Sequence, residues 1–195
     1  RAEARRSAAR SMVLLENRGA LPFPKSLKTL AVLGALADSR ADLLGSWIGD
    51  GRPEDAATIR EALKEALPKA RLTDSLKDAE AAVVVVGETS GMSGEAASRS
   101  DLSLPQGQLE LVRRAHESGK PYAVVLVTGR PLAVPWLAEN ARALLLAWQP
   151  GSEGARAVVD ILFGDAVPGG KLPVSFPRSV GQVPVYYAYK NSGRP

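Results

Sequence analysis

The sequence predicts an α/β fold. We expect a three-layer sandwich in which a mostly parallel sheet of five to six strands, with one antiparallel edge strand, has helices on both faces. Four short apolar runs, at residues 29–34, 82–87, 122–127 and 143–147, have the length of strands. Apolar runs without polar alternation are typical of strands buried on both faces of a parallel sheet. Segments with helical patterning separate these runs, as connections between parallel strands require.

The residues before the first of these strands predict a helix and a connector. Apolar side chains recur at helical spacing over residues 2–17, and Gly19 follows them, so the helix should end near Asn17. Two prolines then make a stiff connector. We therefore divide the chain into an N-terminal helix and connector (1–28), a single α/β-sandwich domain (29–190) and a truncated linker (191–195).

The remaining elements follow from the same patterns. Three helices are predicted over residues 56–67, 105–117 and 154–163, because each segment has helical spacing and a proline or glycine soon after its end. Two further strands are expected. Residues 69–73 are a weak candidate, and residues 171–176 are a better one near an edge, since their proline cannot donate to a ladder.

The composition excludes several classes of chemistry. The chain has no cysteine, which rules out disulfides, cysteine–zinc sites, iron–sulfur clusters and thiol catalysis. A single histidine, His116, excludes most metal sites and most Ser-His-Asp schemes, and we expect neither a metal nor another cofactor. We read His116 as a helix-end or solvent-facing residue. No apolar run approaches the roughly 18 residues of a membrane span, so we expect no membrane partner.

The positive charge has a simple interpretation. Lysine and arginine outnumber aspartate and glutamate by 25 to 21, which gives a net charge of +4. Four of the arginines lie within the first ten residues. We read them as a solvated helix face, and we expect no nucleic-acid partner.

Two loops that follow predicted strands carry the candidate chemistry. Ligands of open α/β sheets bind outside the carboxyl ends of the strands. The segment 87–101 is long, polar and spaced by glycines, and it contains Glu88, Glu95 and Arg99. Ordering such a loop costs backbone entropy, which favours a function over the alternative of a mobile surface loop. After the first strand, Trp47 is either a plug on the core or a stacking platform for a sugar ring.

Nine short strings occur along the chain in this order: Leu14–Asn17 with Leu21–Pro22, Leu44–Trp47, Val86–Glu88, Ser93–Leu102, Thr128–Pro131, Gly151–Gly154, Leu162–Asp165, Pro168–Pro177 and Pro184–Tyr187. Together they resemble the second, α/β-sandwich domain of family 3 glycoside hydrolases, above all the periplasmic bacterial β-glucosidases. Each string alone is weak, but nine in the family's order span the chain essentially end to end.

The resemblance implies half of an active site. Enzymes of that family hydrolyse β-linked glucosides with retention, which needs two carboxyl groups about 5–5.5 Å apart. The family places its aspartate nucleophile on a preceding TIM-barrel domain and its acid/base glutamate on a loop of the α/β domain. A barrel takes about 250 residues, and nothing in this chain resembles one. We therefore expect the isolated chain to be inactive and to need that barrel to act on a β-glucoside or β-linked oligosaccharide, in a parent protein that is periplasmic or secreted.

The motif positions implied by the resemblance assign roles to individual residues. Glu95 matches the acid/base, and Glu88 is the rival, whose alternative role is to pair with a cation such as Arg99 or Arg130. Trp47 matches a tryptophan that helps clamp the sugar beyond the cleaved bond, and Arg99 is a candidate for substrate binding. The competing hypothesis is a catalytically silent carbohydrate-binding or interaction module of the same fold.

One departure from the family's pattern lies between the predicted helix at 56–67 and the strand at 82–87. The family usually has a longer stretch there, often with a clear strand, whereas this chain has about a dozen residues. The segment 69–73 is therefore either a truncated strand or no strand at all.

Overall fold

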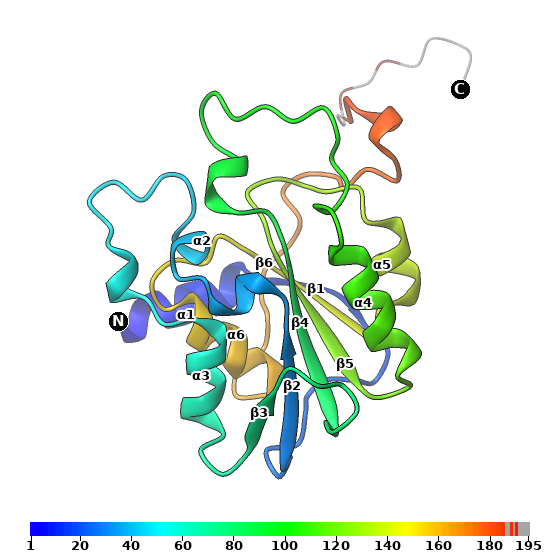
Figure 1. Cartoon of the computed structure of the whole chain (residues 1–195). Helices are drawn as coiled ribbons and strands as arrows, with labels where there is room; N and C mark the ends of the chain where they lie inside the picture. The colour runs from blue at the N-terminus through cyan, green and yellow to red at the C-terminus, as the bar shows by residue number, and fades with distance from the viewer. Residues whose placement is uncertain (186–187, 189, 191–195) are drawn as a thin grey trace.

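The computed structural model describes residues 1–185, 188 and 190 (Figure 1). The predicted linker 191–195 lies outside these residues. Within them, six strands form one sheet in the order β1-β6-β5-β4-β2-β3. The strands are β1 (Val13–Asn17), β2 (Thr29–Leu33), β3 (Arg71–Thr73), β4 (Ala81–Gly87), β5 (Tyr122–Val127) and β6 (Ala143–Trp148). Strands β2 to β6 run parallel and β1 pairs antiparallel with β6, which confirms the predicted fold class.

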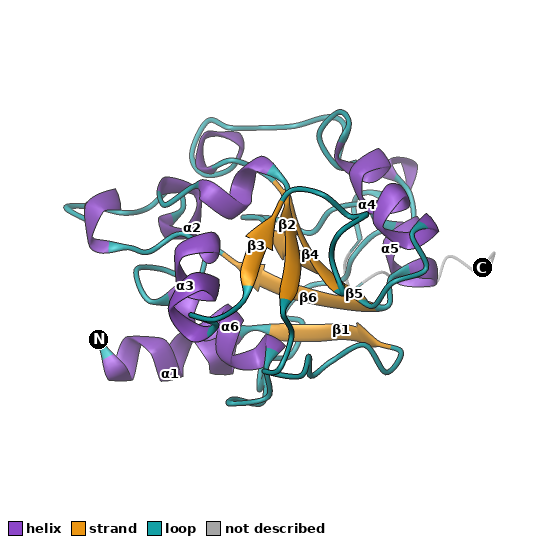
Figure 2. Ribbon diagram, turned by 60° about the horizontal axis from the view of Figure 1, so that its bottom comes forward, coloured by secondary structure: helices purple, strands orange, loops and turns teal. Residues whose placement is uncertain are grey.

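Helices cover both faces of the sheet (Figure 2). One face carries α1 (Ala2–Ser11), α3 (Ile59–Ala66) and α6 (Gly154–Leu162), and the other carries α4 (Gln108–Glu117) and α5 (Pro135–Asn140). The remaining helical turns lie in connections: η1 (Ala35–Asp38), α2 (Ala41–Leu44), η2 (Pro53–Asp55), η3 (Ser90–Met92) and η4 (Val180–Gln182). Among the described residues, no helix combines the length and the apolar character that crossing a membrane demands.

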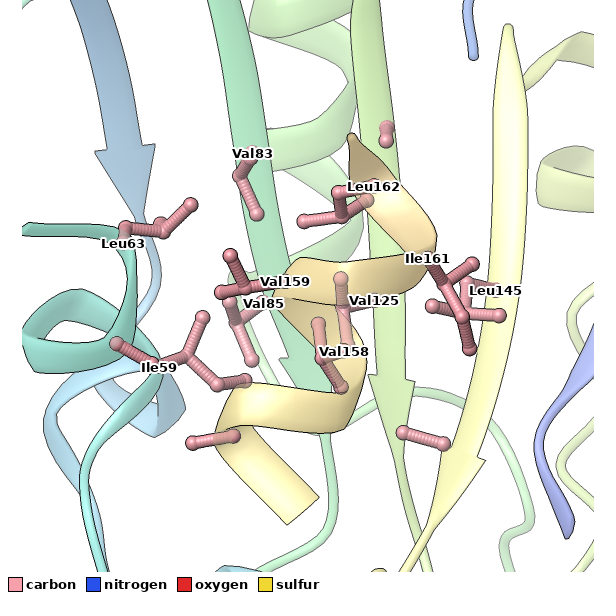
Figure 3. Packing of buried hydrophobic residues seen from close by; sticks show 14 of the residues in the cluster. Ile59, Leu63, Val83, Val85, Val125, Leu145, Val158, Val159, Ile161 and Leu162 are labelled. Atoms are coloured by element: carbon pink, nitrogen blue, oxygen red, sulfur yellow. The ribbon is translucent and has the colours of Figure 1, made fainter. Parts of the chain in front are cut away.

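The side chains of the central strand β4 contribute to the hydrophobic layers on both faces of the sheet. All of its residues are buried, and successive side chains point to opposite faces of the sheet. Val83 and Val85 pack in the layer of α1, α3 and α6, whereas Val84 and Val86 pack in the layer of α4 and α5. Figure 3 shows the first layer, where the side chains of α6 pack against those of β4, β5 and β6, with Ile59 and Leu63 of α3 beside them. This double burial explains why the run contains no polar residue.

Two of the predicted elements are wrong. The first helix ends at Ser11, and residues 13–17 form the antiparallel edge strand β1, with Val13 opposite Leu146. Met12 already has extended backbone angles, and pairing with β6 outweighs the local helical spacing. Residues 171–176 do not form a strand, and their proline removes one of the donors that a ladder would need.

The other boundaries shift by a few residues. The helix expected over 56–67 begins at Ile59, because Thr58 caps it: its hydroxyl accepts from the Glu61 amide while the Glu61 carboxylate accepts from the Thr58 amide. The helix expected over 105–117 begins at Gln108. The weak strand candidate at 69–73 is confirmed as β3, a truncated strand that pairs in parallel with β2.

Candidate active site

The loops that follow β2, β4, β5 and β6 meet at one edge of the sheet. In Figure 1 the loop after β4 and the loop around residue 50 both lie beyond the carboxyl ends of the strands. The contacts are close: a Cβ added to Gly129 would lie 2.1 Å from the Oγ of Ser93, and one added to Gly45 would lie 2.3 Å from Oε1 of Gln149. The sequence therefore locates this edge correctly as the place where its candidate loops converge.

Glu95 lies at the tip of the 88–107 loop, which joins β4 to α4. Its neighbours Gly94 and Ala96 both have positive φ angles, of 104° and 58°, which is uncommon for alanine. The turn carries the Glu95 side chain into solvent. A carboxyl group in this position is available to a substrate or to a second domain that approaches the edge.

Trp47 lies beside the same turn. The residue is 73% exposed. A Cβ added to Gly94 would come 3.7 Å from Nε1 of the indole and 2.8 Å from the Cβ of Ser46. The Oγ of Ser46 lies 2.6 Å from the carbonyl oxygen of Ser93, which fastens the two loops together. The structure thus brings Trp47 close to Glu95, although 48 positions separate them in the sequence.

Glu88 has the opposite environment. Its side chain is fully buried directly after β4. Oε1 accepts a hydrogen bond of 2.6 Å from Nη1 of Arg99 and lies 3.2 Å from Nε of Arg130. The latter contact is electrostatic only, because Nε of Arg130 is buried without hydrogen-bond geometry to any described residue. Oε2 lies 2.8 Å from the Thr128 hydroxyl, which can donate to it. A carboxylate covered in this way has no path to a sugar in this conformation.

Arg99 lies at the base of the loop. It donates to Glu88 through Nη1 and to the carbonyl oxygen of Ser103 through Nη2 (3.2 Å), and its side chain is 21% exposed. The Ser103 amide in turn donates to Asp101 and lowers the pKa of that exposed carboxyl. The two hydrogen bonds of Ser103, from Arg99 to its carbonyl oxygen and from its amide to Asp101, order the segment between Glu95 and α4.

Sequence analysis names Arg130 only as an alternative partner of Glu88, and it misses Thr128 and Gln108. Thr128 and Arg130 follow β5 directly, so their place at the carboxyl end of a strand adjacent to β4 is a usable signal. Gln108 had no such signal: its amide oxygen accepts from the Gly87 amide (2.6 Å) and its amide nitrogen donates to the Gly87 carbonyl (2.9 Å). This pair of bonds ties the end of β4 to the start of α4.

His116 is placed away from this edge. It is half-buried, its Nδ1 lies 3.2 Å from the hydroxyl of Tyr122, and its ring packs edge-on against Trp136. Tyr122 begins β5, so the pair lies at the amino ends of the parallel strands. His116 lies in the last turn of α4, which confirms the helix-end alternative, whereas its side chain does not face solvent freely.

Comparison with known proteins agrees with this architecture. The family described as "Glycosyl hydrolase family 3 C-terminal domain" matches residues 12–195. The chain belongs to this family. A periplasmic beta-glucosidase of Salmonella typhimurium is 39% identical over 236 aligned positions, which cover the whole of this chain and 31% of that protein. A beta-xylosidase of Formosa agariphila is 36% identical, over 92% of this chain and 28% of that protein.

Solved structures of the glycosyl hydrolase family 3 show the same fold. A crystal structure of beta-glucosidase from Listeria innocua superposes with a TM-score of 0.91 at 35% identity, and the match covers all of this chain and 29% of that one. Another crystal of the Listeria enzyme contains glucose. The chain thus spans less than a third of the length of these relatives and corresponds to one of their domains.

Proposed function

We propose that this chain supplies the acid/base half of a retaining β-glucosidase. Glu95 would act as general acid and then as general base, and an aspartate on a TIM-barrel domain outside these residues would act as nucleophile. The observation that carries the proposal is the exposure of Glu95 beside Trp47, on the edge where the loops of four parallel strands meet. Glu88, the rival carboxyl, is buried among cations and lacks such access.

The chemistry explains why this half needs a partner. In a retaining mechanism the acid protonates the departing glycosidic oxygen, and the same group later removes a proton from water. The two carboxyl groups must lie about 5–5.5 Å apart. A general acid that works near neutral pH also needs shielding from water or a neighbouring carboxylate. A docked barrel would supply both conditions to Glu95 and would close the site over the sugar.

Trp47 would bind the sugar on the leaving-group side. An exposed indole offers an apolar face to the C–H groups of a pyranose ring while the hydroxyls stay hydrated. Nε1 of the indole lies beside the Gly94 turn, and this nearness to Glu95 supports the assignment. The substrate would be a β-glucoside or a β-linked oligosaccharide, and the parent enzyme would work in the periplasm or outside the cell.

The leaving-group dependence of hydrolysis tests the role of Glu95. In the parent enzyme, Glu95→Gln should lower kcat/KM for an alkyl glucoside by about 10²–10⁴-fold, because that leaving group needs protonation. The loss should be much smaller for a dinitrophenyl glucoside, whose leaving group departs as an anion. Glu110→Gln on the exposed face of α4 is the matched control. Equal losses on both substrates would contradict an acid role.

A second test uses the isolated chain. We expect no measurable turnover of an aryl glucoside by the 195 residues alone, and rates like those of the parent enzyme would refute the composite site. The exposed Trp47 also suits the alternative of a silent sugar-binding module. Calorimetric binding of cellobiose to the isolated chain, lost in Trp47→Ala, would favour that alternative if the parent enzyme with Glu95→Gln kept full activity.

A further inference from the structure

The 88–107 loop is fastened by buried charge. Its only buried residues are Glu88 and Ser93, both polar. Arg99 reaches Glu88 from within the loop, and Arg130 reaches it from the loop after β5. Two guanidinium groups therefore share one carboxylate oxygen, at 2.6 and 3.2 Å.

The remaining N–H groups of these arginines hold the loop backbone. Nη2 of Arg130 donates to the carbonyl oxygen of Ala97 at 2.7 Å and to that of Met92. Nη2 of Arg99 donates to the carbonyl oxygen of Ser103. Met92 precedes Glu95 and Ala97 follows it. Arg130 therefore holds the backbone on both sides of Glu95, and Arg99 holds it further along, at Ser103.

We infer that Glu88 is a positioning residue for the acid/base turn. It acts through Arg99 and Arg130, whose guanidinium groups it fixes, and these fix the carbonyl groups that set the direction of the Glu95 turn. The positioning of the turn is argued from these contacts alone, whereas an effect of Glu88 on catalysis rests on the role proposed for Glu95. Because the Glu88 side chain is fully buried, it does not touch substrate in this arrangement.

The inference requires a charge at position 88, not merely a hydrogen-bond acceptor. The cluster already holds two cations against one anion. A neutral amide would leave both guanidinium groups without a carboxylate in direct contact, although both are largely buried, which disfavours their present positions. Thr128 and the clamp of Gln108 on Gly87 hold the carboxylate and its backbone in place, so the anion is fixed from the sheet side.

Hydrogen exchange of the 195-residue chain tests the structural part. In Glu88→Gln, the amides of Met92 and Ala97, which are hydrogen-bonded within the loop, and that of Ser90, which donates to Asp42 of α2, should exchange at least about tenfold faster, while amides of β4 and β5 keep their protection. Glu88→Asp keeps the charge and should recover part of the protection. Glu95→Gln makes the same chemical change at the exposed tip and should alter nothing. Unchanged exchange in folded Glu88→Gln would overturn the inference.

A second variant covers failure of the first to fold. Arg99 is partly exposed, so Arg99→Gln should leave the core intact while it loosens the loop between Ala97 and Ser103. If Glu88→Gln shows no cooperative unfolding transition, the same exchange experiment on Arg99→Gln decides. Faster exchange at Ala97 and Ser103 supports the inference, and unchanged exchange in the folded variant overturns it.

Kinetics of the parent enzyme separate this inference from the role of Glu95. Glu88→Gln should reduce kcat for an alkyl glucoside by about 10–100-fold, with a smaller change in KM and a smaller loss on a dinitrophenyl glucoside. A loosened loop with unchanged kinetics would support the positioning of the turn and refute the role of Glu95. An unchanged loop, together with a leaving-group effect in Glu95→Gln, would refute the positioning and support Glu95.

Discussion

Strand β4 and the 88–107 loop adjoin in the chain and are built by opposite means. Every residue of β4 is buried and uncharged, and two layers of helices hold it by apolar contact. The loop buries only Glu88 and Ser93, and ion pairs and hydrogen bonds to backbone carbonyls hold it. The sheet thus determines where the loop begins, and the buried charges determine where its tip points.

The difference matches the work proposed for each region. Apolar packing is dense and non-directional, so it makes a rigid platform for several loops at once. Ion pairs and hydrogen bonds have preferred directions, so they can set the orientation of a turn without covering its outer surface. The tip that carries Glu95 stays exposed and free to meet another surface, while its base remains anchored.

The largest expected effect comes from a methyl group at the junction of the two regions. Gly87 has a φ of 135°, and a Cβ there would lie 1.8 Å from the carbonyl oxygen of Val127. Gly87→Ala should therefore cost at least about 3 kcal/mol of unfolding free energy in urea denaturation. Gly91→Ala, four residues into the loop, meets no atom within 4 Å and should cost less than about 0.5 kcal/mol. Similar costs for the two variants would show that β4 and the loop are equally constrained.

The same contrast explains which parts of the fold the sequence could predict. The runs at 82–87, 122–127 and 143–147 match β4, β5 and β6 to within one residue, because burial on both faces leaves an unbroken apolar pattern. Local spacing wrongly predicts a helix over residues 13–17, because their partner is β6, with Val13 opposite Leu146, and local spacing does not contain that pairing. The helical pattern also starts before the helix at 59–66 does, because the separate turn at Pro53–Asp55 precedes the cap of that helix.

Some features of the candidate site also follow from the sequence, and others do not. Placement of Glu95 and Trp47 at one edge follows from parallel topology, since loops after parallel strands emerge on the same side. Burial of Glu88 between two arginines does not follow, because Arg130 arrives from a different strand and its direction depends on the packed structure. The sequence suggests that Glu88 pairs with one arginine, but the oxygen shared by two arginines and the hydrogen bonds to the loop carbonyls depend on the packed structure.

An effect of intermediate size is expected at Thr128, where a substitution of nearly equal volume tests the contact with the buried Glu88 carboxylate. Thr128 is fully buried, and its hydroxyl lies 2.8 Å from Oε2 of Glu88. Thr128→Val keeps the volume and removes a donor to a buried carboxylate, which should cost about 1–3 kcal/mol in urea denaturation. Thr89→Val makes the same change at the exposed neighbour of Glu88 and should lie within about 0.5 kcal/mol of the parent chain. Equal values for the two variants would mean that the hydroxyl of Thr128 does not support the anchor.

The smallest expected effect comes from replacing Glu61, which we compare with Glu88. Glu61 accepts hydrogen bonds from donors of similar kinds, but at an exposed site. Arg40 donates to Oε1 of Glu61 at 2.6 Å, and the Thr58 amide donates to Oε2 at 2.8 Å. The hydrogen bond from Arg40, followed by that from the Thr58 amide, lowers the pKa of Glu61. The Glu61 side chain is 46% exposed, so solvent screens the pair.

The lowered pKa of Glu61 determines the sign of the pH dependence. Its carboxylate stabilises the folded chain at pH values above its unfolded-state pKa, and that stabilisation is lost as the pH falls through the lower folded-state value. Glu61→Gln should therefore cost about 0.5–1 kcal/mol in urea denaturation at pH 7, and the cost should shrink below about pH 4. Glu54→Gln at an exposed position nearby is the control. A cost that stays constant with pH would assign the loss to packing or capping geometry, and a cost as large as that of Thr128→Val would erase the distinction between exposed and buried anchors.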